Sequence, residues 1–316
     1  MLVAFSFFGQ LITAVAALTT AAAFSTFMGF RKEEKIMKRK ALSILVACFA
    51  LSAVSCGGSS VSDSELYVGL ECNYAPFNWT ENAANDYTLP IFNHAGSYAD
   101  GYDIQIAKIL GEKTGKKVHI VKTVWESLVP DLQSGSINCV IAGMTDTEDR
   151  EKSIDFTSEY YRSELVLVTK KDVASTVTSP LNESQFGAFI KDKQIESQNQ
   201  TLTDDLIESV FVKYGAIHNT PVSSFALAAI DVVNGSAFAM TAEFPVAQSI
   251  VASNDSLGIV HLDQAILGDS LKELGVSIGV KKGSALKDTL TSALNDINQE
   301  TRNTLMSAAL IRSSGK

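Results

Sequence analysis

The sequence predicts an α/β fold made of two lobes. Strand and helix patterns alternate from residue 65 onward, and this order is typical of a largely parallel sheet covered by helices. The alternation fills two successive segments of about 100 residues, and each length suits one domain. With 316 residues, of which 46% are hydrophobic, the chain has enough apolar material for two packed cores.

The first half of this region is expected to contain four strands separated by helices. Strands are predicted where β-branched and other apolar residues cluster, at residues 66–71, 118–124, 137–143 and 165–170. Helices are predicted at residues 103–115 and 126–135, each closed by a glycine suited to a C-cap, with a further turn of helix at 147–152. Residues 82–101 are the only long loop that the sequence predicts.

The second half of the chain repeats this organisation. Its strands are predicted at residues 186–190, 237–242 and 276–280. Its helices are predicted at residues 202–213, 224–234 and 244–252, and a long amphipathic helix or helix pair follows at 284–311.

The first 55 residues differ in composition from the rest of the chain. They carry six basic and two acidic side chains, a net charge of +4, whereas residues 56–316 carry −13. A basic cluster at 37–40 precedes an apolar run of 15 residues, 41–55, which has the length of the h-region of a secretory signal. We therefore expect a signal peptide at residues 37–55.

The end of this run, Leu-Ser-Ala-Val-Ser-Cys at residues 51–56, resembles the lipobox of bacterial lipoproteins. The resemblance implies that Cys56 is lipidated and that residues 56–64, rich in Gly and Ser, tether the protein to the extracytoplasmic face of the cell membrane. In a host with an outer membrane, that face borders the periplasmic space.

Residues 1–36 have two interpretations. Residues 2–30 carry no charge and are long enough to cross a bilayer, so they are read either as an extra transmembrane segment or as an extension upstream of the true start at Met37. The second interpretation is favoured, because a spanning helix directly before a second signal is unusual. Under both, the bulk of the chain is exported.

Charge and cysteine content argue against several classes of function. The strongly acidic exported part is unsuited to nucleic acid, because binding phosphates needs clustered Lys and Arg. Cys72 and Cys139 are interpreted as two separately buried thiols, with a disulfide as the alternative. Their spacing suits no zinc site, and neither a metal nor a cofactor is expected.

Candidate binding residues follow three of the predicted strands. In open α/β sheets the crevice at the carboxyl ends of the strands binds ligands. Tyr74 and Trp125 each follow a strand, although an aromatic at either position is also typical of core packing. Residues 143–150 offer backbone N–H groups, the Thr145 hydroxyl and Arg150, a combination suited to a carboxylate; the alternative is a solvated arginine on a helix.

Five motifs occur in order in the first lobe: Tyr-Ala-Pro-Phe at 74–77, Gly-Tyr-Asp-Ile-Gln-Ile-Ala at 101–107, Trp-Glu-Ser-Leu-Val-Pro-Asp-Leu-Gln-Ser-Gly at 125–135, Ile-Ala-Gly-Met-Thr-Asp-Thr-Glu-Asp-Arg at 141–150 and Ile-Asp-Phe-Thr-Ser-Glu-Tyr-Tyr at 154–161. Together they resemble the polar amino acid-binding proteins of ABC importers, the family 3 extracellular solute-binding proteins. The resemblance covers residues 65 to 283 and is stronger in the first lobe.

The resemblance implies a type II periplasmic-binding-protein fold, the Venus flytrap, with two Rossmann-like lobes. Lobe 1 would comprise residues 65–167 and 276–316, and lobe 2 residues 168–275. Two strands, near residues 165–171 and 274–281, would form the hinge.

The resemblance also implies which residues hold the carboxylate of an amino acid. Arg150 matches the arginine that pairs with the α-carboxylate, and Thr145 and Gly143 match its neighbours that contribute a hydroxyl and main-chain contacts. Thr201 matches the residue of the second lobe that closes on the same carboxylate.

The rest of the ligand would contact four further residues. Glu243 matches the acidic residue that receives the α-ammonium, and Tyr74 and Trp125 match the aromatics that sandwich the ligand side chain. Glu71 matches a position that reaches the distal end of the ligand, or alternatively faces water. Because a zwitterion loses its hydration in the cleft, each charge needs a paired partner, and contacts to both lobes would favour the closed state.

The resemblance therefore implies a lipid-anchored, monomeric receptor that captures a polar L-amino acid and delivers it to an ABC permease, without enzymatic activity. Glu71 and the acidic exported domain favour a basic ligand, arginine or lysine. The alternatives are a cleft enzyme of the same fold, similar to prephenate or arogenate dehydratases, and the sensor domain of a receptor.

Overall fold

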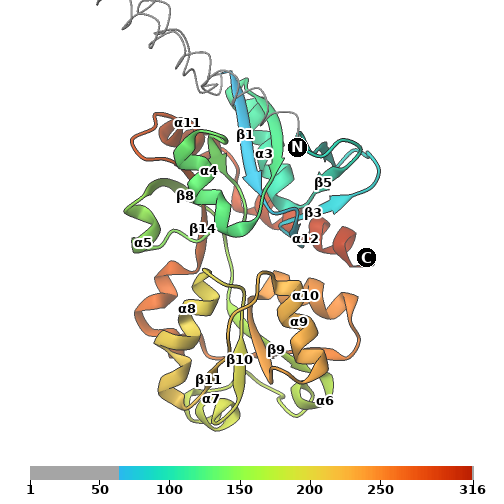
Figure 1. Cartoon of the computed structure of the whole chain (residues 1–316), viewed down its shortest axis with the longest axis vertical. Coiled ribbons are helices and arrows are strands. Elements are labelled where there is room, and N and C mark those ends of the chain that lie inside the picture. The colour runs from blue at the N-terminus through green and yellow to red at the C-terminus, as the bar shows by residue number, and fades with distance from the viewer. Residues whose placement is uncertain (1–63, 315–316) are drawn as a thin grey trace, which may run out of the picture. The chain divides into compact units, whose positions relative to one another are not determined.

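A computed structural model describes residues 64–314, shown in colour in Figure 1. The predicted extension at 1–36, the signal peptide at 37–55, the lipidated Cys56 and nearly all of the 56–64 tether lie outside the described residues. Within the described part of the chain, no helix is both long and apolar enough to cross a membrane.

The first lobe is built on a five-stranded sheet in the order β6-β1-β7-β14-β8. β1 (Glu65–Leu70) pairs in parallel with β6 (Lys117–Lys122) and β7 (Cys139–Val140), whereas β14 (Gly275–Lys281) is antiparallel to β7 and to β8 (Ile154–Arg162). Its helical segments are α3 (Tyr102–Thr114), η2 (Trp125–Ser127), α4 (Leu128–Ser134), α5 (Glu148–Glu151), α11 (Leu286–Asn295) and α12 (Gln299–Ser313). The predicted alternation is confirmed here, but the sheet is mixed because β14 returns from the second lobe.

The predicted long loop at residues 82–101 is wrong in part, since it contains two short strands. β4 (Leu89–Pro90) and β5 (Tyr98–Asp100) join β2 (Asn73–Tyr74) and β3 (Asn78–Glu81) in a small antiparallel sheet of order β2-β3-β5-β4. These strands are two to four residues long, so they leave no recognisable period in the sequence.

The second lobe has its own five-stranded sheet, in the order β11-β10-β12-β9-β13. β10 (Gln194–Glu196) is parallel to β11 (Ile217–His218) and β12 (Ala239–Glu243), whereas β9 (Leu165–Lys170) is antiparallel to β12 and β13 (Leu257–His261). The helical segments are α6 (Lys171–Ala174), α7 (Glu183–Ile190), α8 (Leu202–Ser209), η3 (Phe211–Tyr214), α9 (Phe225–Asn234), α10 (Phe244–Ser253) and η4 (Gln264–Leu274).

The strand predicted at residues 186–190 is wrong, because this segment is the second half of helix α7. A capping box starts the helix: Asn182 accepts from the Gln185 N–H, and the Gln185 side chain accepts from the Asn182 N–H. Phe186 and Ile190, four residues apart, lie on one helical face and are fully buried. The strand of this region, β10, comes four residues later than α7 ends.

The chain passes between the two sheets twice (Figure 1). It leaves β8 at Arg162 and enters β9 at Leu165, and it returns from η4 directly into β14 at Gly275. β9 lies wholly in the second sheet, so the sequence-based division at residue 167 falls inside a strand rather than before it.

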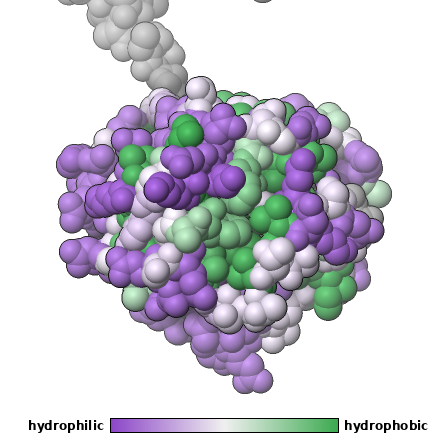
Figure 2. All heavy atoms as spheres, turned by 90° about the horizontal axis from the view of Figure 1, so that it is seen from below, coloured by the Kyte–Doolittle hydropathy of each residue, from purple (hydrophilic) through white to green (hydrophobic). Residues whose placement is uncertain are grey.

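Buried apolar residues form two clusters. One is confined to the second lobe, around Phe186, Leu206 and Phe211, while the larger one extends from the first lobe into β9, α9 and α10 of the second. In the view from below in Figure 2, hydrophobic residues gather near the middle and hydrophilic ones around the rim. Because its members come from both lobes, the larger cluster continues across the interface between the lobes, where the candidate site lies.

Candidate ligand-binding site

All eight residues predicted from the sequence line one cavity between the two sheets. The first lobe contributes Glu71, Tyr74, Trp125, Gly143, Thr145 and Arg150, and the second lobe contributes Thr201 and Glu243 together with Gln198, Leu202 and Phe225. Most of these residues follow the carboxyl end of a strand, namely β1, β6, β7, β10 or β12. The structure thus brings together residues up to 172 positions apart in the sequence.

The two lobes are closed on one another over this cavity. Four hydrogen bonds join the lobes at this cavity: Tyr74 Oη donates to Glu243 Oε2 (2.5 Å), Gln198 Nε2 to Glu71 Oε1 (3.0 Å), Trp125 Nε1 to the Gln200 carbonyl (3.1 Å) and Arg150 Nη2 to the same carbonyl (2.9 Å). The cavity has a volume of only about 10 Å³, too small for an amino acid. An amino acid therefore needs the lobes to separate before it can enter.

Arg150 is held rigidly at one end of the cavity. Its Nη1 donates to the Thr145 carbonyl (2.8 Å) and to the Thr145 hydroxyl (2.7 Å), and its guanidinium lies 5.2 Å from the centre of the Trp125 ring. Burial lowers the pKa of Arg150 to about 10, so the side chain stays charged at neutral pH. Among residues 64–314 no carboxylate forms an ion pair with it, and a desolvated cation without a counter-ion is a site for an anion.

Glu243 supplies the opposite charge from the second lobe. It is the last residue of β12 and the N-cap residue of α10, and burial raises the pKa of its carboxyl while the Tyr74 hydrogen bond lowers it. In the described part of the chain, no cationic side chain pairs with it. A buried carboxylate without a cation is suited to an ammonium group.

Glu71 is the third charged side chain of the cavity. Burial raises the pKa of Glu71 to about 7, the hydrogen bond from Gln198 lowers it, and nearby Glu126 raises it further. Gln198 is 2% exposed and also donates to the Ser223 carbonyl (3.2 Å), so its amide is fixed in place. The sequence did not identify Gln198, because a single Gln in a loop carries no distinctive signal.

Aromatic rings form the side wall of the cavity. Tyr74 stacks on Phe225 across the lobes (5.0 Å between ring centres) and on Phe77 within its own lobe (5.3 Å). Gly143 has a φ of +60°, and a Cβ there would lie 2.7 Å from Tyr74 Cε1. Only glycine therefore lets Tyr74 approach the main chain this closely.

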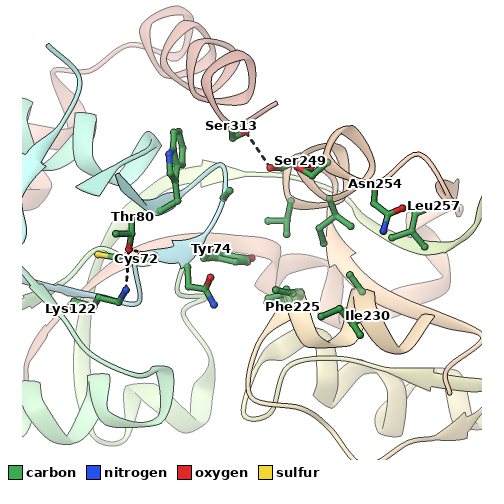
Figure 3. A pocket seen from close by; sticks show the side chains of 18 residues that line it. Cys72, Tyr74, Thr80, Lys122, Phe225, Ile230, Ser249, Asn254, Leu257 and Ser313 are labelled. Atoms are coloured by element: carbon green, nitrogen blue, oxygen red, sulfur yellow. Dashed lines mark hydrogen bonds between the residues drawn. The ribbon is translucent and has the colours of Figure 1, made fainter. Parts of the chain in front are cut away.

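Tyr74 and Phe225 also separate this cavity from a second, larger one. Figure 3 shows the second cavity, about 570 Å³, between the loop after β1 and helices α9 and α10. Apolar side chains such as Ile230 and Leu257 line most of it, and Lys122, bonded to Thr80, is its charged member. Its two walls belong to different lobes, so its volume changes when the lobes open or close.

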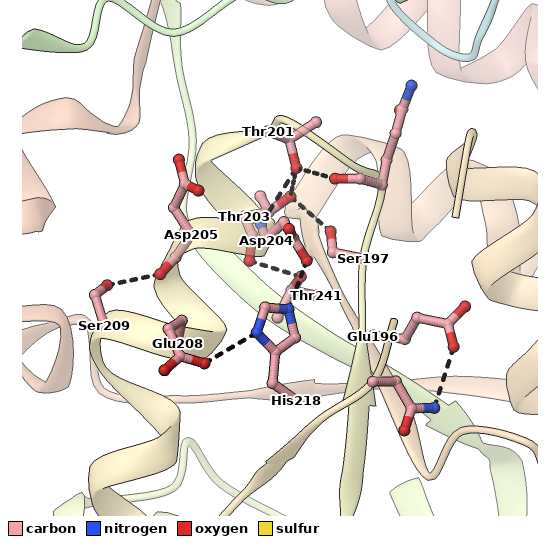
Figure 4. A network of polar contacts seen from close by, with 12 residues as sticks. Glu196, Ser197, Thr201, Thr203, Asp204, Asp205, Glu208, Ser209, His218 and Thr241 are labelled. Atoms are coloured by element: carbon pink, nitrogen blue, oxygen red, sulfur yellow. Dashed lines mark hydrogen bonds and ion pairs between the residues drawn. The ribbon is translucent and has the colours of Figure 1, made fainter. Parts of the chain in front are cut away.

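Thr201 is anchored within the second lobe (Figure 4). Its hydroxyl donates to the Gln198 carbonyl (2.7 Å), accepts from the Asp204 N–H as the N-cap of α8 (3.2 Å) and contacts the Thr203 hydroxyl (2.9 Å). Thr203 in turn contacts Ser197 (2.8 Å), so the loop that carries Gln198 and Thr201 is tied to β10.

His218 connects the same helix to the edge strand β11. Its two ring nitrogens face Asp204 (2.8 Å) and Glu208 (3.2 Å) of α8. Burial alone would lower the pKa of His218, but the hydrogen bonds to Asp204 and Glu208 outweigh this effect and raise it. The folded state therefore binds the imidazole proton more tightly than the unfolded state does.

We expect a His218→Gln variant to lose stability in a pH-dependent way. The contribution of His218 is fully present below its ordinary pKa of about 6.5 and is lost as pH rises through the raised folded-state value. At pH 6 the unfolding midpoint should fall by about 2–4 °C, with a smaller deficit at pH 8.5. Thermal unfolding followed by circular dichroism measures this, with exposed His94→Gln as control; a deficit that does not change with pH contradicts the prediction.

Comparisons with known proteins agree with this geometry. Residues 66–308 match the profile of the bacterial extracellular solute-binding proteins, family 3. The arginine-binding extracellular protein ArtP of Bacillus subtilis (strain 168) is 26% identical over 267 residues, which cover 83% of this chain and 93% of the relative. A probable histidine-binding protein of Campylobacter jejuni is 26% identical over 233 residues, covering 70% and 80% respectively.

The fold is shared with solved structures. The crystal structure of the amino acid ABC transporter substrate-binding protein AbpA from Streptococcus pneumoniae, bound to L-arginine, has a TM-score of 0.66 at 21% identity, covering 80% of this chain and 97% of that one. The fold is that of type II periplasmic binding proteins, as the sequence predicted. On the match over residues 66–308, the chain belongs to the bacterial extracellular solute-binding proteins, family 3.

Proposed function

We propose that this protein is the substrate-binding component of an ABC importer and captures a polar L-amino acid between its lobes. The observation that carries the proposal is the pair of unmatched charges in one aromatic-lined cavity, Arg150 from the first lobe and Glu243 from the second. A free amino acid carries the complementary pair, a carboxylate and an ammonium, on one carbon. Relatives named as arginine-, histidine- and glutamine-binding proteins support this ligand class.

The ligand would bridge the lobes. Its carboxylate would accept from Arg150 and Thr145, and its ammonium would donate to Glu243 in place of the Tyr74 hydroxyl. Both contacts exist together only when the lobes are closed, so the ligand stabilises the closed state by its differential affinity. The two crossings between the sheets, at residues 163–164 and at Leu274–Gly275, are the proposed hinge.

A panel of the twenty amino acids tests this function directly. Purified protein from residue 57 onward is titrated by calorimetry and heated with each amino acid in excess. One or more polar amino acids should bind and raise the unfolding midpoint, because a ligand that binds only the folded state stabilises it. Stabilisation by none of the twenty would overturn the proposal.

The distal end of the cavity favours a basic ligand. Glu71 carries the only carboxyl group besides Glu243 that lines the cavity within the described residues, and Gln198 fixes its Oε1. Its Oε2 is left to accept from a guanidinium or an ε-ammonium. We therefore propose arginine or lysine as the ligand.

Glu71→Gln should weaken arginine binding about 10- to 100-fold and leave glutamine binding nearly unchanged, because only the cation loses a charged acceptor. In the wild type, arginine affinity should fall by up to about tenfold per pH unit below pH 7, as Glu71, whose pKa is about 7, takes up a proton. This slope should be absent in the variant. Calorimetry at pH 5.5–8 measures both, and Glu126→Gln, which removes a neighbouring charge outside the cavity, is the control. Equal arginine affinity in Glu71→Gln refutes the basic preference.

The remaining features of the proposal concern location and partners. We propose that Cys56 carries the lipid that anchors the protein outside the cytoplasm, that the protein acts as a monomer, and that it delivers its ligand to the membrane subunits of a permease. Among the described residues two carboxylates line the cavity, and the proposal assigns both of them to ligand binding. Mass spectrometry of the membrane-extracted protein, with Cys56→Ala as the unlipidated control, tests the anchor.

A further inference from the structure

A chain of fully buried polar groups lies behind the candidate site in the first lobe. Asp103, at the start of α3, accepts from the Tyr160 hydroxyl of β8 (2.7 Å) and from the Asn78 side-chain amide of β3 (2.8 Å). Asn78, Asp103 and Tyr160 are each 0% exposed. We call these three residues the Asp103 network.

The Asp103 network ends on two main-chain N–H groups. The Tyr160 hydroxyl oxygen accepts from Gly143 N (2.9 Å), and Asn78 Oδ1 accepts from Cys72 N (2.9 Å). Gly143 lines the cavity, and Cys72 lies between the cavity residues Glu71 and Tyr74. The network therefore joins the two first-lobe loops that carry most of the site.

Both of these N–H groups belong to residues with a left-handed backbone. Gly143 has a φ of 60° and Cys72, which is not a glycine, has a φ of 53°. A left-handed backbone at a residue other than Gly or Asn is unfavourable and persists only where its surroundings hold it. The hydrogen bond from Cys72 N to Asn78 is a contact that does so.

The direction of every hydrogen bond in the network follows from Asp103. Because an ionised carboxylate only accepts, it takes the single proton of the Tyr160 hydroxyl and turns the oxygen toward Gly143. It likewise attracts the NH₂ of Asn78 and turns the amide oxygen toward Cys72. An amide at position 103 would place a donor against Tyr160 or Asn78, and one of the two partners would have to reorient.

We infer that Asp103 is a positioning residue for ligand binding, which sets the Glu71–Tyr74 loop and Gly143 through Asn78 and Tyr160 without touching the ligand. This inference rests on the proposed amino acid-binding function. Burial raises the pKa of Asp103 to about 8, while the hydrogen bonds from Tyr160 and Asn78 lower it. These two donors therefore stabilise the carboxylate, and the carboxylate in turn fixes the orientation of both donors. Such mutual dependence is typical of a buried polar network, which orders its surroundings only when every member is satisfied.

A pair of variants separates positioning from bulk stability. Asp103→Asn should weaken arginine binding about 10- to 100-fold and speed amide hydrogen exchange at Cys72 and Gly143, because one buried group loses its partner. The swap Asn78→Asp/Asp103→Asn restores all four pairings. The new amide at position 103 would donate to the new carboxylate at position 78 and accept from Tyr160, and that carboxylate would accept from Cys72 N. The swap should therefore recover most of the affinity and the slow exchange.

A half-buried control residue lies at the opposite end of the first-lobe sheet. Asn138 also bridges the main chain, accepting from Tyr67 N (2.8 Å) and donating to the Glu65 carbonyl (2.7 Å), and it does not line the cavity. Asn138→Asp should lower the unfolding midpoint without changing arginine affinity. Calorimetry, thermal unfolding and NMR-detected exchange give the three readouts for every variant.

Three results would overturn the inference. The first is unchanged exchange at Cys72 and Gly143 in Asp103→Asn, and the second is a swap variant as impaired as the single variant. Loss of affinity in Asn138→Asp equal to that in Asp103→Asn would also overturn it, since the effect would then follow stability alone. If the wild type binds no amino acid, the proposed function fails, while the exchange data still decide whether Asp103 positions the two loops.

Discussion

Arg150→Ala is expected to reduce the affinity for every amino acid ligand by roughly 150- to 5,000-fold. Removing one partner of a buried charge pair costs about 3–5 kcal/mol, because the other charge is left desolvated and unpaired. In this protein Arg150 is the only cationic side chain of the described residues that lines the cavity, so nothing nearby can replace it. Isothermal titration calorimetry with arginine, lysine and glutamine measures the loss.

Chemical analogues make this test specific for the carboxylate. Agmatine is arginine without its carboxylate, so it should bind the wild type weakly and lose little further affinity in Arg150→Ala. Lys152→Ala removes an exposed cation two residues away, one that pairs with Asp149, and should leave binding unchanged. Arg150→Lys should have an affinity between those of the wild type and Arg150→Ala. Its ammonium keeps the positive charge, but it cannot donate to Thr145 and to a carboxylate with the fixed planar geometry of a guanidinium. Arginine affinity within threefold of the wild type in Arg150→Ala would place the carboxylate elsewhere.

Glu243→Gln is expected to cost about 2–3 kcal/mol of binding free energy, or roughly 30- to 150-fold in affinity. Glutamine keeps an oxygen to accept from the Tyr74 hydroxyl, so the closed lobes retain this bridge, but the charge that would receive the ammonium is gone. The unliganded protein should unfold at nearly the same temperature. The effect should therefore appear in calorimetric affinity and not in the midpoint without ligand.

The control for Glu243 is another buried glutamate of the same lobe. Glu196 lies on β10, is 3% exposed and accepts from Asn219 instead of lining the cavity (Figure 4). Glu196→Gln should leave affinity unchanged. A ligand without the α-ammonium, 5-guanidinovalerate, should bind Glu243→Gln and the wild type equally. If 5-guanidinovalerate loses as much affinity in Glu243→Gln as arginine does, Glu243 stabilises the closed lobes and does not bind the ammonium.

The local signals in the sequence were sufficient for most of the fold. Helix α3 begins and ends within one residue of the range that the apolar period and Gly115 predict, and Gly115 is left-handed with a φ of 67°. Helix α7 was misread, because Phe-Gly-Ala-Phe-Ile at residues 186–190 is a short apolar run that fits a strand as well as a buried helix. The capping box at Asn182 was the signal that distinguishes the two.

The sequence by itself determined the two-lobed α/β architecture, because strand ends and glycine caps are local features of the chain, and the resemblance of its motifs to a known family indicated which eight residues meet in the cavity. Only the tertiary structure decided what surrounds them. The stack of Tyr74 on Phe225, the bond from Gln198 to Glu71 and the bond from Gly143 to Tyr160 join residues 17 to 151 positions apart. Such contacts depend on how the two sheets pack against each other, and the hydrophobic periodicity of the two contacting segments does not reveal that packing.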